Sequence, residues 1–458
     1  MAAVPTIAAS PVDAAPAHAP TVAMLPFSYV IEDFLDKISV SLESYCTEMS
    51  GGWYFGYIEA LKRAGVRTIA VCFSARVSQP TSFMNKPTGI TMWVLPSPRI
   101  YRALVRHISN PYGRNVAQAF GGVHGARRIA YPLLWLLKEL APYFATQFRP
   151  LADVMRHEHC DAILCQEYEY ASFDKCALLG RRLRLPVFAT FQGGDYQRGR
   201  WERVIRPRTI RAAAGLIIAT RKETERVRAR YGVDATKLAR IFNPVDLTEW
   251  TPVDRTSARA TLDIPPTALV IAWHGRVTIQ QKGLDVLLTA WEQVCRQHKS
   301  RDLRLLLVGT GRDAELLRQR IASLHLPGIH WINEYLLDRD AIRRHLCAAD
   351  VYVFPSRHEG FPVAPIEAMA CGLPVVAADA NGVADIFAGG ESSGGIVVPR
   401  DDAPELARAL VRLLDDESLR RRMGAQSRLR VETHFSLEAV GQQLRDFLCA
   451  HGLPRPIR

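Results

Sequence analysis

Two carboxylates flank a glycine-containing turn within one short stretch of the chain, His358 to Val376. Glu359 directly precedes Gly360, and seven residues separate Glu359 from Glu367. Unpaired backbone N–H groups at the start of a helix can bind phosphate, and carboxylates can accept hydrogen bonds from sugar hydroxyls. A phosphate and a polyol together indicate a nucleotide sugar. The alternative for two isolated glutamates at this spacing is a solvated surface loop.

The elements that would position these carboxylates can be recognised on either side of them. Val351 to Phe354 is an apolar run of β-forming residues, too short for a helix, and predicts a strand. Pro365 suits the first turn of a short helix, and Gly372 suits its end. Pro374 then prevents the helix from continuing. We therefore expect Glu359 in a loop and Glu367 in a helix, beyond the carboxyl end of a strand.

Two cations follow another predicted strand, Leu269 to Trp273. Arg276 comes directly after Gly275, and Lys282 precedes the glycine that opens the next helix. Cations at a strand end, beside the start of a helix, can neutralise a diphosphate. The alternative is a pair of solvated charges.

The complete string, with Gly360-Phe361-Pro362 and Gly372-Leu373-Pro374-Val375-Val376, resembles the donor-site signature of glycosyltransferase family 4, retaining enzymes of the GT-B fold. The resemblance covers residues 160–450 strongly and 24–75 weakly. It implies an α/β protein with two Rossmann-like domains, whose parallel sheets face a central cleft. The donor nucleotide sugar would bind the second domain, and the acceptor would bind the first.

The resemblance also implies roles for residues of the second half. Arg276 and Lys282 would hold the donor diphosphate and stabilise the charge that grows on it. Glu359 would hold the sugar ring and phosphate together with the amides of Gly360 to Val363, and Glu367 would accept hydrogen bonds from the ribose hydroxyls. The other expected donor contacts are Gly275, Gly309, Gly311, Asn333, Glu334, Tyr335, Gly360, Phe361, Pro362 and Val363.

Residues on the acceptor side are expected in the first half. Gly51-Gly52, before a segment of helical period, resembles the glycine loop of the family, although a simple turn before a helix would look the same. Gln192-Gly193 ends a predicted strand where the family often has histidine. An amide can form hydrogen bonds with a sugar hydroxyl but cannot carry a proton as imidazole does. Asn243 opens a loop that resembles the one closing the first domain in the family.

Alternating strand and helix patterns, typical of parallel sheets covered on both faces, divide the chain into domains. We expect a disordered Ala/Pro-rich extension over residues 1–24, an acceptor-binding domain over 25–246 with a first strand over 24–30, and a linker over 247–266. The donor domain is expected over 267–435, and an amphipathic helix within 436–458 would cross back to the first domain. Strands of the donor domain are predicted over 269–273, 303–308, 329–332, 351–354, 374–377 and 395–398.

Basic charge is concentrated in one part of the first domain. No Asp or Glu lies between Glu59 and Glu139, where twelve Lys and Arg residues occur, and the formal net charge of the chain is +12. An anionic bilayer or lipid phosphate is the expected partner, with a solubilising surface as the alternative. No zinc finger or RNP-like aromatic pattern indicates nucleic acid. The segment Ile129 to Phe148, broken by two prolines, fits an interfacial helix or a core helix.

Nine scattered cysteines, with no Cys-x-x-Cys pair, indicate reduced thiols in a cytoplasmic protein. No apolar run is long enough to span a membrane, so we expect a protein that lies in the cytoplasm or peripherally on the inner face of the membrane. Asp338-Arg339-Asp340 is interpreted as the capped start of a helix and not as a metal-binding motif. No metal and no other cofactor are expected.

The sequence and its resemblance therefore predict a retaining, metal-independent hexosyltransferase. It would use a nucleotide-diphosphate sugar as donor and a hydroxyl of a glycolipid, a lipid-linked sugar or a polysaccharide precursor as acceptor. A phosphorylase or nucleotide-sugar epimerase of the same fold is one alternative. A non-catalytic protein that binds anionic lipid or polysaccharide is the other.

Overall fold

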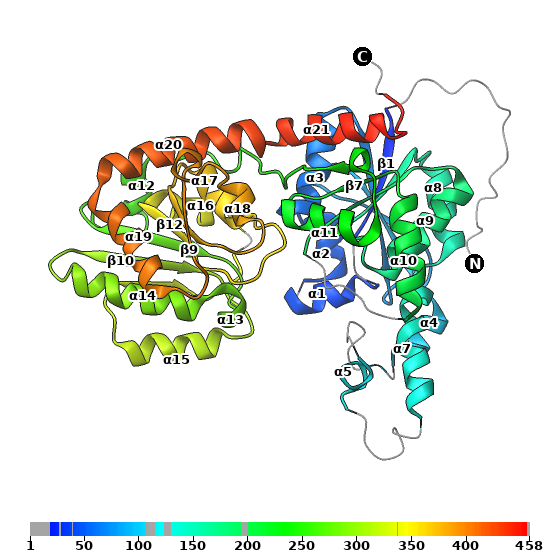
Figure 1. Cartoon of the computed structure of the whole chain (residues 1–458), viewed down its shortest axis with the longest axis horizontal. Coiled ribbons are helices and arrows are strands. Elements are labelled where there is room, and N and C mark those ends of the chain that lie inside the picture. Colours follow the sequence, from blue (N-terminus) through cyan, green and yellow to red (C-terminus); the bar gives the residue numbers. More distant parts are fainter. Residues whose placement is uncertain are drawn as a thin grey trace.

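A computed structural model describes residues 19–26, 29–38, 40–106, 108, 115–122, 130–193, 200–336 and 338–455. Within these residues the chain forms two α/β domains, each built around one sheet (Figure 1). The sheets have eight and six strands and the orders β3-β4-β2-β1-β5-β6-β7-β8 and β11-β10-β9-β12-β13-β14. This is the predicted α/β class with two Rossmann-like sheets.

The first sheet is parallel except for β3, which pairs antiparallel with β4 at its edge. Its strands are β1 (Thr21–Leu25), β2 (Arg67–Ser74), β3 (Thr81–Met84), β4 (Thr91–Pro96), β5 (Ala162–Cys165), β6 (Val187–Thr190), β7 (Gly215–Ile217) and β8 (Leu238–Ala239). Around it lie α1 (Glu32–Ile38), α2 (Leu42–Thr47), α3 (Gly52–Arg63), α4 (Arg99–Val105), α5 (Val116–Phe120), α7 (Tyr131–Ala145), α8 (Phe148–His157), α9 (Ala171–Leu183), α10 (Arg200–Ala212), α11 (Arg221–Tyr231) and the 3-10 helix η1 (Ala235–Lys237).

The second sheet is parallel throughout. Its strands are β9 (Leu269–His274), β10 (Leu303–Val308), β11 (Ile329–Ile332), β12 (Val351–Phe354), β13 (Val375–Ala378) and β14 (Gly395–Val398). Its helices are α12 (Arg255–Ala260), α13 (Ile279–Lys282), α14 (Leu284–Gln297), α15 (Ala314–Leu324), α16 (Arg339–Ala348), α17 (Ala364–Ala370), α18 (Val383–Ile386), the 3-10 helix η2 (Gly390–Ser393), α19 (Ala403–Asp415) and α20 (Glu417–His434). All six predicted strands of this domain are present, within one residue of the expected bounds.

The N-terminal boundary differs from the prediction. Strand β1 begins at Thr21, so residues 21–24 belong to the first domain and not to the extension expected over 1–24. The strand predicted over 24–30 is therefore shifted, because Pro26 cannot donate to the ladder and β1 ends before it. Thr21 is fully buried, since β1 lies between β2 and β5. Residues 1–18 lie outside the described part of the chain.

The linker expected over 247–266 is also a correction, because most of this segment packs into the second domain. Trp250, Ala258 and Ile264 are buried with apolar residues of β9 and β12. Arg259 donates to Asp350 at 2.8 Å. The sparse apolar residues between prolines gave no periodic pattern, although most of them pack in the core or against it.

The last helix, α21 (Leu437–Ala450), lies on the first domain, whereas α20 lies on the second. Figure 1 shows the two helices running along one edge of both domains. Leu437, Val440, Leu444 and Leu448 join the core around α3, and a Cβ on Gly441 would lie 2.1 Å from the carbonyl oxygen of Ala60. This is the position expected for residues 436–458. No helix among the described residues is long and apolar enough to cross a membrane.

Candidate functional site

The order of strands in the second sheet brings the predicted donor residues to one edge. Because the strands are parallel, their carboxyl ends meet at that edge. Asn333 follows β11, Gly309 follows β10, Arg276 follows β9 and Glu359 follows β12. Since these strands are neighbours in the order β11-β10-β9-β12, the four segments form a row across the top of the sheet.

A cavity of about 510 Å³, the interdomain cavity, lies beyond this row. It brings together seven of the predicted residues: Gly52, Gly275, Arg276, Gly309, Glu334, Tyr335 and Glu367. Its other lining residues come from both domains and are Val40, Ser44, Glu48, Met49, Ser50, Trp250, His274, Val308, Leu336, Arg339 and Ile342. The predicted residues outside this lining are Gly51, Gln192, Gly193, Asn243, Lys282, Gly311, Asn333, Glu359, Gly360, Phe361, Pro362 and Val363.

Glu367 is held in the interdomain cavity by a histidine that sequence reasoning missed. His274 Nε2 lies 2.8 Å from Glu367 Oε2, and only 8% of His274 is exposed. Tyr352 donates from its hydroxyl to the carbonyl oxygen of His274 at 3.3 Å, and the ring of Trp250 lies beside the imidazole. The hydrogen bond to His274 thus occupies one carboxylate oxygen of Glu367, Oε2. The signal for His274 was its position at a strand end, directly before Gly275-Arg276.

Lys282 and Glu359 form an ion pair with 2.6 Å between Nζ and Oε1. Both side chains are mostly buried, with 15% and 11% exposure. Arg357 fixes the loop that carries Glu359, because it donates to both carboxylate oxygens of Asp285 at 2.8 and 2.9 Å. Burial alone would raise the pKa of Asp285, but the hydrogen bonds and charge of Arg357 lower it, so the carboxylate stays ionised.

The signature loop contacts the first domain through glycines. A Cβ on Gly193 would lie 2.5 Å from the Cα of Gly360, and a Cβ on Gly360 would lie 2.2 Å from the carbonyl oxygen of Gln192. Only glycine permits this approach of the two backbones. Phe361 is 6% exposed and stacks on Phe242 with 5.2 Å between ring centroids. Its ring therefore belongs to the core, and only its backbone can contact a ligand.

Gly309 and Gly311 pack closely against neighbouring backbone, and Asn333 has a buried carboxamide oxygen. A Cβ on Gly309 would lie 2.0 Å from the carbonyl oxygen of Gly275, and one on Gly311 would lie 2.3 Å from that of Val277. Both positions therefore require glycine, because the backbone packs closely against them. Asn333 Oδ1 is buried and has no hydrogen-bond partner among the described residues.

Gln192 is paired with Asn243 through both carboxamides. Asn243 Nδ2 donates to Gln192 Oε1 at 2.9 Å, and Gln192 Nε2 donates to Asn243 Oδ1 at 3.1 Å. The backbone N–H of Gln192 donates to Glu167 Oε1 at 2.6 Å. The structure thus brings together two residues predicted separately on the acceptor side and fixes the orientation of both amides.

A smaller cavity of about 170 Å³ adjoins the interdomain cavity and shares Arg339 with it. Gly51 and Gly52 line it together with Glu59 and Glu249. Arg339 forms an ion pair with Glu249 and donates to the carbonyl oxygen of Ser50 at 3.3 Å. Burial raises the pKa of Glu59 despite the nearby Lys62 and Arg63. Sequence reasoning missed Arg339, because it is far in sequence from the glycine loop that it covers.

Asp338 caps α16 as predicted, because its Oδ1 accepts from the backbone N–H groups of Asp340 and Ala341 at 2.9 and 3.3 Å. Arg339 follows the cap in the first turn, which points its side chain toward the first domain. The interpretation of this triplet as a helix start is therefore confirmed, and it also explains how Arg339 reaches both cavities.

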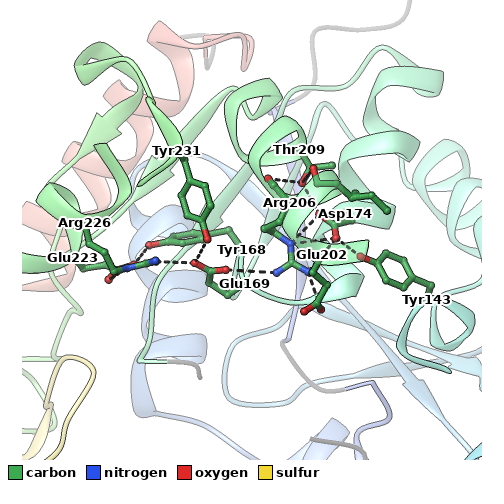
Figure 2. Close-up of polar contacts among 11 residues, drawn as sticks. Tyr143, Tyr168, Glu169, Asp174, Glu202, Arg206, Thr209, Glu223, Arg226 and Tyr231 are labelled. Atoms are coloured by element: carbon green, nitrogen blue, oxygen red, sulfur yellow. Dashed lines mark hydrogen bonds and ion pairs between the residues drawn. The ribbon is translucent and has the colours of Figure 1, made fainter. Parts of the chain in front are cut away.

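A group of charged residues in the first domain is largely buried. Arg206 is 3% exposed and donates to Asp174 from Nε and Nη2 at 3.0 Å, while its Nη1 lies 3.7 Å from Glu169 Oε2. Figure 2 shows these residues joined to Tyr143 and Arg226 in a buried network, which ties α7 and α9 to α10 and α11. Six arginines occur over residues 198–211, and the network uses one of them, Arg206, for structure. Another of the six, Arg198, lies outside the described residues.

In the acid-free segment of the first domain, some basic residues form ion pairs and others do not. Arg67 and Arg76 form ion pairs with Glu158 and Asp36. Within the part of the chain that the structure describes, no ion pair is found for Lys86, Arg99, Arg102 or Arg106. Arg114, Arg127 and Arg128 lie outside that part.

Helix α7 has features of both predictions for residues 129–148, an interfacial helix and a core helix. It runs through Pro142, so the expected break at that proline is wrong. Ala141 and Ala145 are buried, whereas Leu133, Leu136 and Phe144 are 58%, 39% and 39% exposed. Figure 1 shows α4, α5 and α7 extending away from the first sheet.

Two family models match the chain. One, described as glycosyl transferases group 1, matches residues 268–416, and the other, described as glycosyltransferase family 4, matches residues 56–249. Over 205 residues the chain is 33% identical to a GDP-mannose-dependent monoacylated alpha-(1-6)-phosphatidylinositol monomannoside mannosyltransferase of Corynebacterium glutamicum, covering 43% of this chain and 51% of that protein. The chain thus spans about half the length of that relative.

A relative matched over a longer segment is alpha-maltose-1-phosphate synthase of Mycobacterium tuberculosis. The two chains are 30% identical over 268 residues, which cover 56% of this chain and 67% of the synthase. Among solved structures, sucrose-phosphate synthase from Thermosynechococcus elongatus superposes with a TM-score of 0.62 at 20% identity, covering 94% of this chain and 98% of that one. Anabaena HepE in complex with UDP gives 0.66 at 16% identity, with 94% and 100% coverage. These two likenesses show the fold.

Proposed function

Because the chain belongs to glycosyltransferase family 4, we propose that it transfers a hexosyl group from a nucleotide-diphosphate sugar to a hydroxyl acceptor. The transfer retains the anomeric configuration and needs no metal ion. The acceptor is a glycolipid, a lipid-linked sugar or a polysaccharide precursor.

The observation that supports this proposal most is the composition of the interdomain cavity. Arg276 supplies positive charge at a strand end, and Glu367 supplies a fixed carboxylate, both within one cavity that also contains Gly52 of the opposite domain. A diphosphate needs the cation, a ribose needs the carboxylate, and an acceptor must approach from the other domain. The presence of all three features in one cavity supports the proposed reaction.

Lys282 and Arg276 stabilise the charge that grows on the leaving diphosphate. Lys282 is held by Glu359 at 2.6 Å, so its position is fixed before a donor binds. The acceptor oxygen forms a bond with the anomeric carbon while the bond from that carbon to the phosphate oxygen breaks. The acceptor proton passes to the leaving phosphate oxygen on the same face of the sugar, which gives retention.

Gln192 orients substrate and takes no part in proton transfer. Its carboxamide has no titratable proton near neutral pH, and it is paired with Asn243. This agrees with a mechanism in which the leaving phosphate accepts the proton. Gln192 and Gly193 face the signature loop at Gly360, so they lie where the two domains meet.

An anionic membrane surface is the proposed partner of the first domain. Exposed Leu133, Leu136 and Phe144 of α7 lie in the same protruding part as Arg99 and Arg102 of α4. Apolar side chains beside arginines suit the boundary between headgroups and acyl chains. The enzyme would then work on the cytoplasmic face of a membrane. Flotation with phosphatidylglycerol vesicles, and none with phosphatidylcholine vesicles, is the expected result.

The proposed reaction is tested by incubating the full chain with UDP-, GDP- and ADP-linked glucose or mannose in the presence of EDTA. Octyl glucoside and phosphatidylinositol serve as hydroxyl acceptors, and NMR of the product gives the anomeric configuration. We expect an α-linked product from an α-linked donor. Arg276→Ala should lower turnover severely with the fold intact, whereas exposed Arg318→Ala should not. Near-normal turnover in Arg276→Ala would contradict the proposal.

The same assay separates the alternatives. A phosphorylase would release sugar only when inorganic phosphate is added, and an epimerase would change the donor sugar without any acceptor. A non-catalytic binder would leave every donor intact while still floating with anionic vesicles.

A further inference from the structure

One end of the interdomain cavity is formed by Glu334 and Tyr335, which follow the edge strand β11. Arg276 follows β9, two strands further into the sheet, and Glu359 follows β12 beside it. Neighbouring strands are about 4.8 Å apart, so the row from β11 to β12 spans roughly 14 Å. A nucleotide sugar laid along this row, with its diphosphate at Arg276 and its sugar at Glu359, has its base at Glu334.

The carboxylate of Glu334 is exposed and not neutralised. Within the described residues it has no ion pair and no hydrogen bond. The nearby arginines of α16 have other partners, because Arg339 pairs with Glu249, Arg343 pairs with Asp340 at 3.0 Å and Arg344 pairs with Asp338 at 3.6 Å. Glu334 therefore offers two free acceptor oxygens at the base end of the cavity.

We propose that Glu334 selects guanine, so that the donor is a guanosine-diphosphate sugar; this rests on the proposed function. Guanine presents two adjacent donors on one edge, its ring N1–H and its amino group. A carboxylate has two acceptor oxygens and pairs with both. Uracil presents one N–H between two carbonyl oxygens, and adenine presents an amino group beside an acceptor nitrogen. Both place acceptor atoms against the carboxylate, which is unfavourable.

Tyr335 and Leu336 complete the recognition of the base. The ring of Tyr335 is 55% exposed at this end of the cavity, and Leu336 lines the cavity beside it. An aromatic ring stacks on any base and an apolar side chain excludes water, so these contacts add affinity without choosing the base. Selection is left to Glu334.

The first measurement is calorimetric titration of the full chain with GDP, UDP and ADP, without metal. A bidentate pair between a side chain and a base changes affinity by roughly 10- to 100-fold. We expect GDP to bind tighter than UDP and ADP by a factor in this range. Inosine diphosphate lacks only the amino group of guanine, so it should bind more weakly than GDP by about 10-fold.

A matched pair of variants separates recognition from folding. Glu334→Gln replaces one acceptor oxygen with a donor, and it should bring GDP within a few-fold of UDP and remove the difference between GDP and inosine diphosphate. Its affinity for UDP should be kept or raised, because the carboxamide can pair with the N–H and one carbonyl oxygen of uracil, and UDP binding also shows that the variant is folded. Glu315→Gln, on exposed α15 and paired with Arg318, should leave all affinities unchanged.

The outcomes distinguish the base assignment from the proposed function. Tighter binding of UDP or ADP than of GDP, or an unchanged GDP preference in Glu334→Gln, overturns guanine selection while leaving a nucleotide site in place. No binding of any nucleoside diphosphate to folded protein contradicts the proposed function itself, and guanine selection with it.

Discussion

The two domains use their charged side chains in opposite ways. In the second domain Arg276 is exposed at a strand end and lines a cavity of about 510 Å³. In the first domain Arg206 is 3% exposed and is surrounded by Asp174, Glu169 and Glu202. The first arrangement leaves charge for a ligand, whereas the second satisfies it internally. The burial of a charged side chain and the number of its ion-pair partners therefore distinguish a ligand-binding residue from a structural one.

Two side-chain pairs at the candidate site of the second domain differ from this scaffold in their number of partners. Lys282 has one carboxylate and Glu367 has one histidine, each from an adjacent segment of the site. Arg206 has three carboxylates from separate elements, as Figure 2 shows. Removing a charge should therefore lower stability in the first domain and activity in the second.

The largest expected effect is on Arg206→Ala. This change leaves three buried carboxylates without their shared cation, and breaking such a network lowers the free energy of unfolding by about 3–5 kcal/mol. Urea denaturation measures the loss. Arg208→Ala, an exposed arginine of the same helix, should change stability by less than about 0.5 kcal/mol. Similar stability of the two variants would show that the network adds little to the fold.

Lys282→Ala should act on turnover instead. Removing one group that stabilises developing charge lowers kcat by roughly 10²- to 10³-fold. We expect this loss in the glycosyl-transfer assay, with a smaller loss of stability than in Arg206→Ala because only Glu359 loses a partner. Lys299→Ala, an exposed lysine beyond α14, is the control. A loss of stability that equals that of Arg206→Ala, with normal kcat in the folded fraction, would reverse the comparison.

The second domain was predictable because its pattern is local. Each strand is a short apolar run, and the signature from His358 to Val376 encodes a loop, a helix and the start of the next strand in adjacent residues. The cavity confirms that Gly275, Arg276 and Glu367 come together. Their roles toward a donor stay a prediction until they are measured.

The residues that sequence reasoning missed depend on contacts between distant segments. His274 meets Glu367 across 93 positions, and Arg339 meets Ser50 across 289. No spacing rule connects such residues, because only the strand order and the meeting of the two domains bring them together. The prediction of a linker over 247–266 was wrong for a related reason, since Trp250 packs on a core that is formed by strands far along the chain.

His274→Phe should have a smaller effect than Lys282→Ala. It removes the 2.8 Å hydrogen bond that orients Glu367, and such a bond contributes about 1 kcal/mol, or roughly fivefold in nucleotide affinity. Titration with a nucleoside diphosphate and with its 2′,3′-dideoxy form tests the role. The variant should lose affinity for the first and not for the second. Equal losses for both ligands would mean that His274 acts through the general structure of the cavity.

The smallest expected effect is at the edge of the buried network. Tyr143 of α7 donates to Asp174 Oδ2 at 2.9 Å, and burial, then the charge of Asp174, raises the pKa of this phenol. The phenol therefore stays protonated and donates at all physiological pH values. Tyr143→Phe removes one hydrogen bond while Arg206 still holds Asp174, so the free energy of unfolding should fall by about 0.5 kcal/mol.

Hydrogen exchange measures where the loss from Tyr143→Phe appears. Because this bond ties α7 to α9, amides of α7 should exchange faster, while those of α10 and α11 should keep their protection. Tyr131→Phe, at the exposed start of the same helix, should change neither. Faster exchange in α10 as well would mean that the network responds as one unit, so that its arginine and its tyrosine are not separable contributions to the scaffold of the first domain.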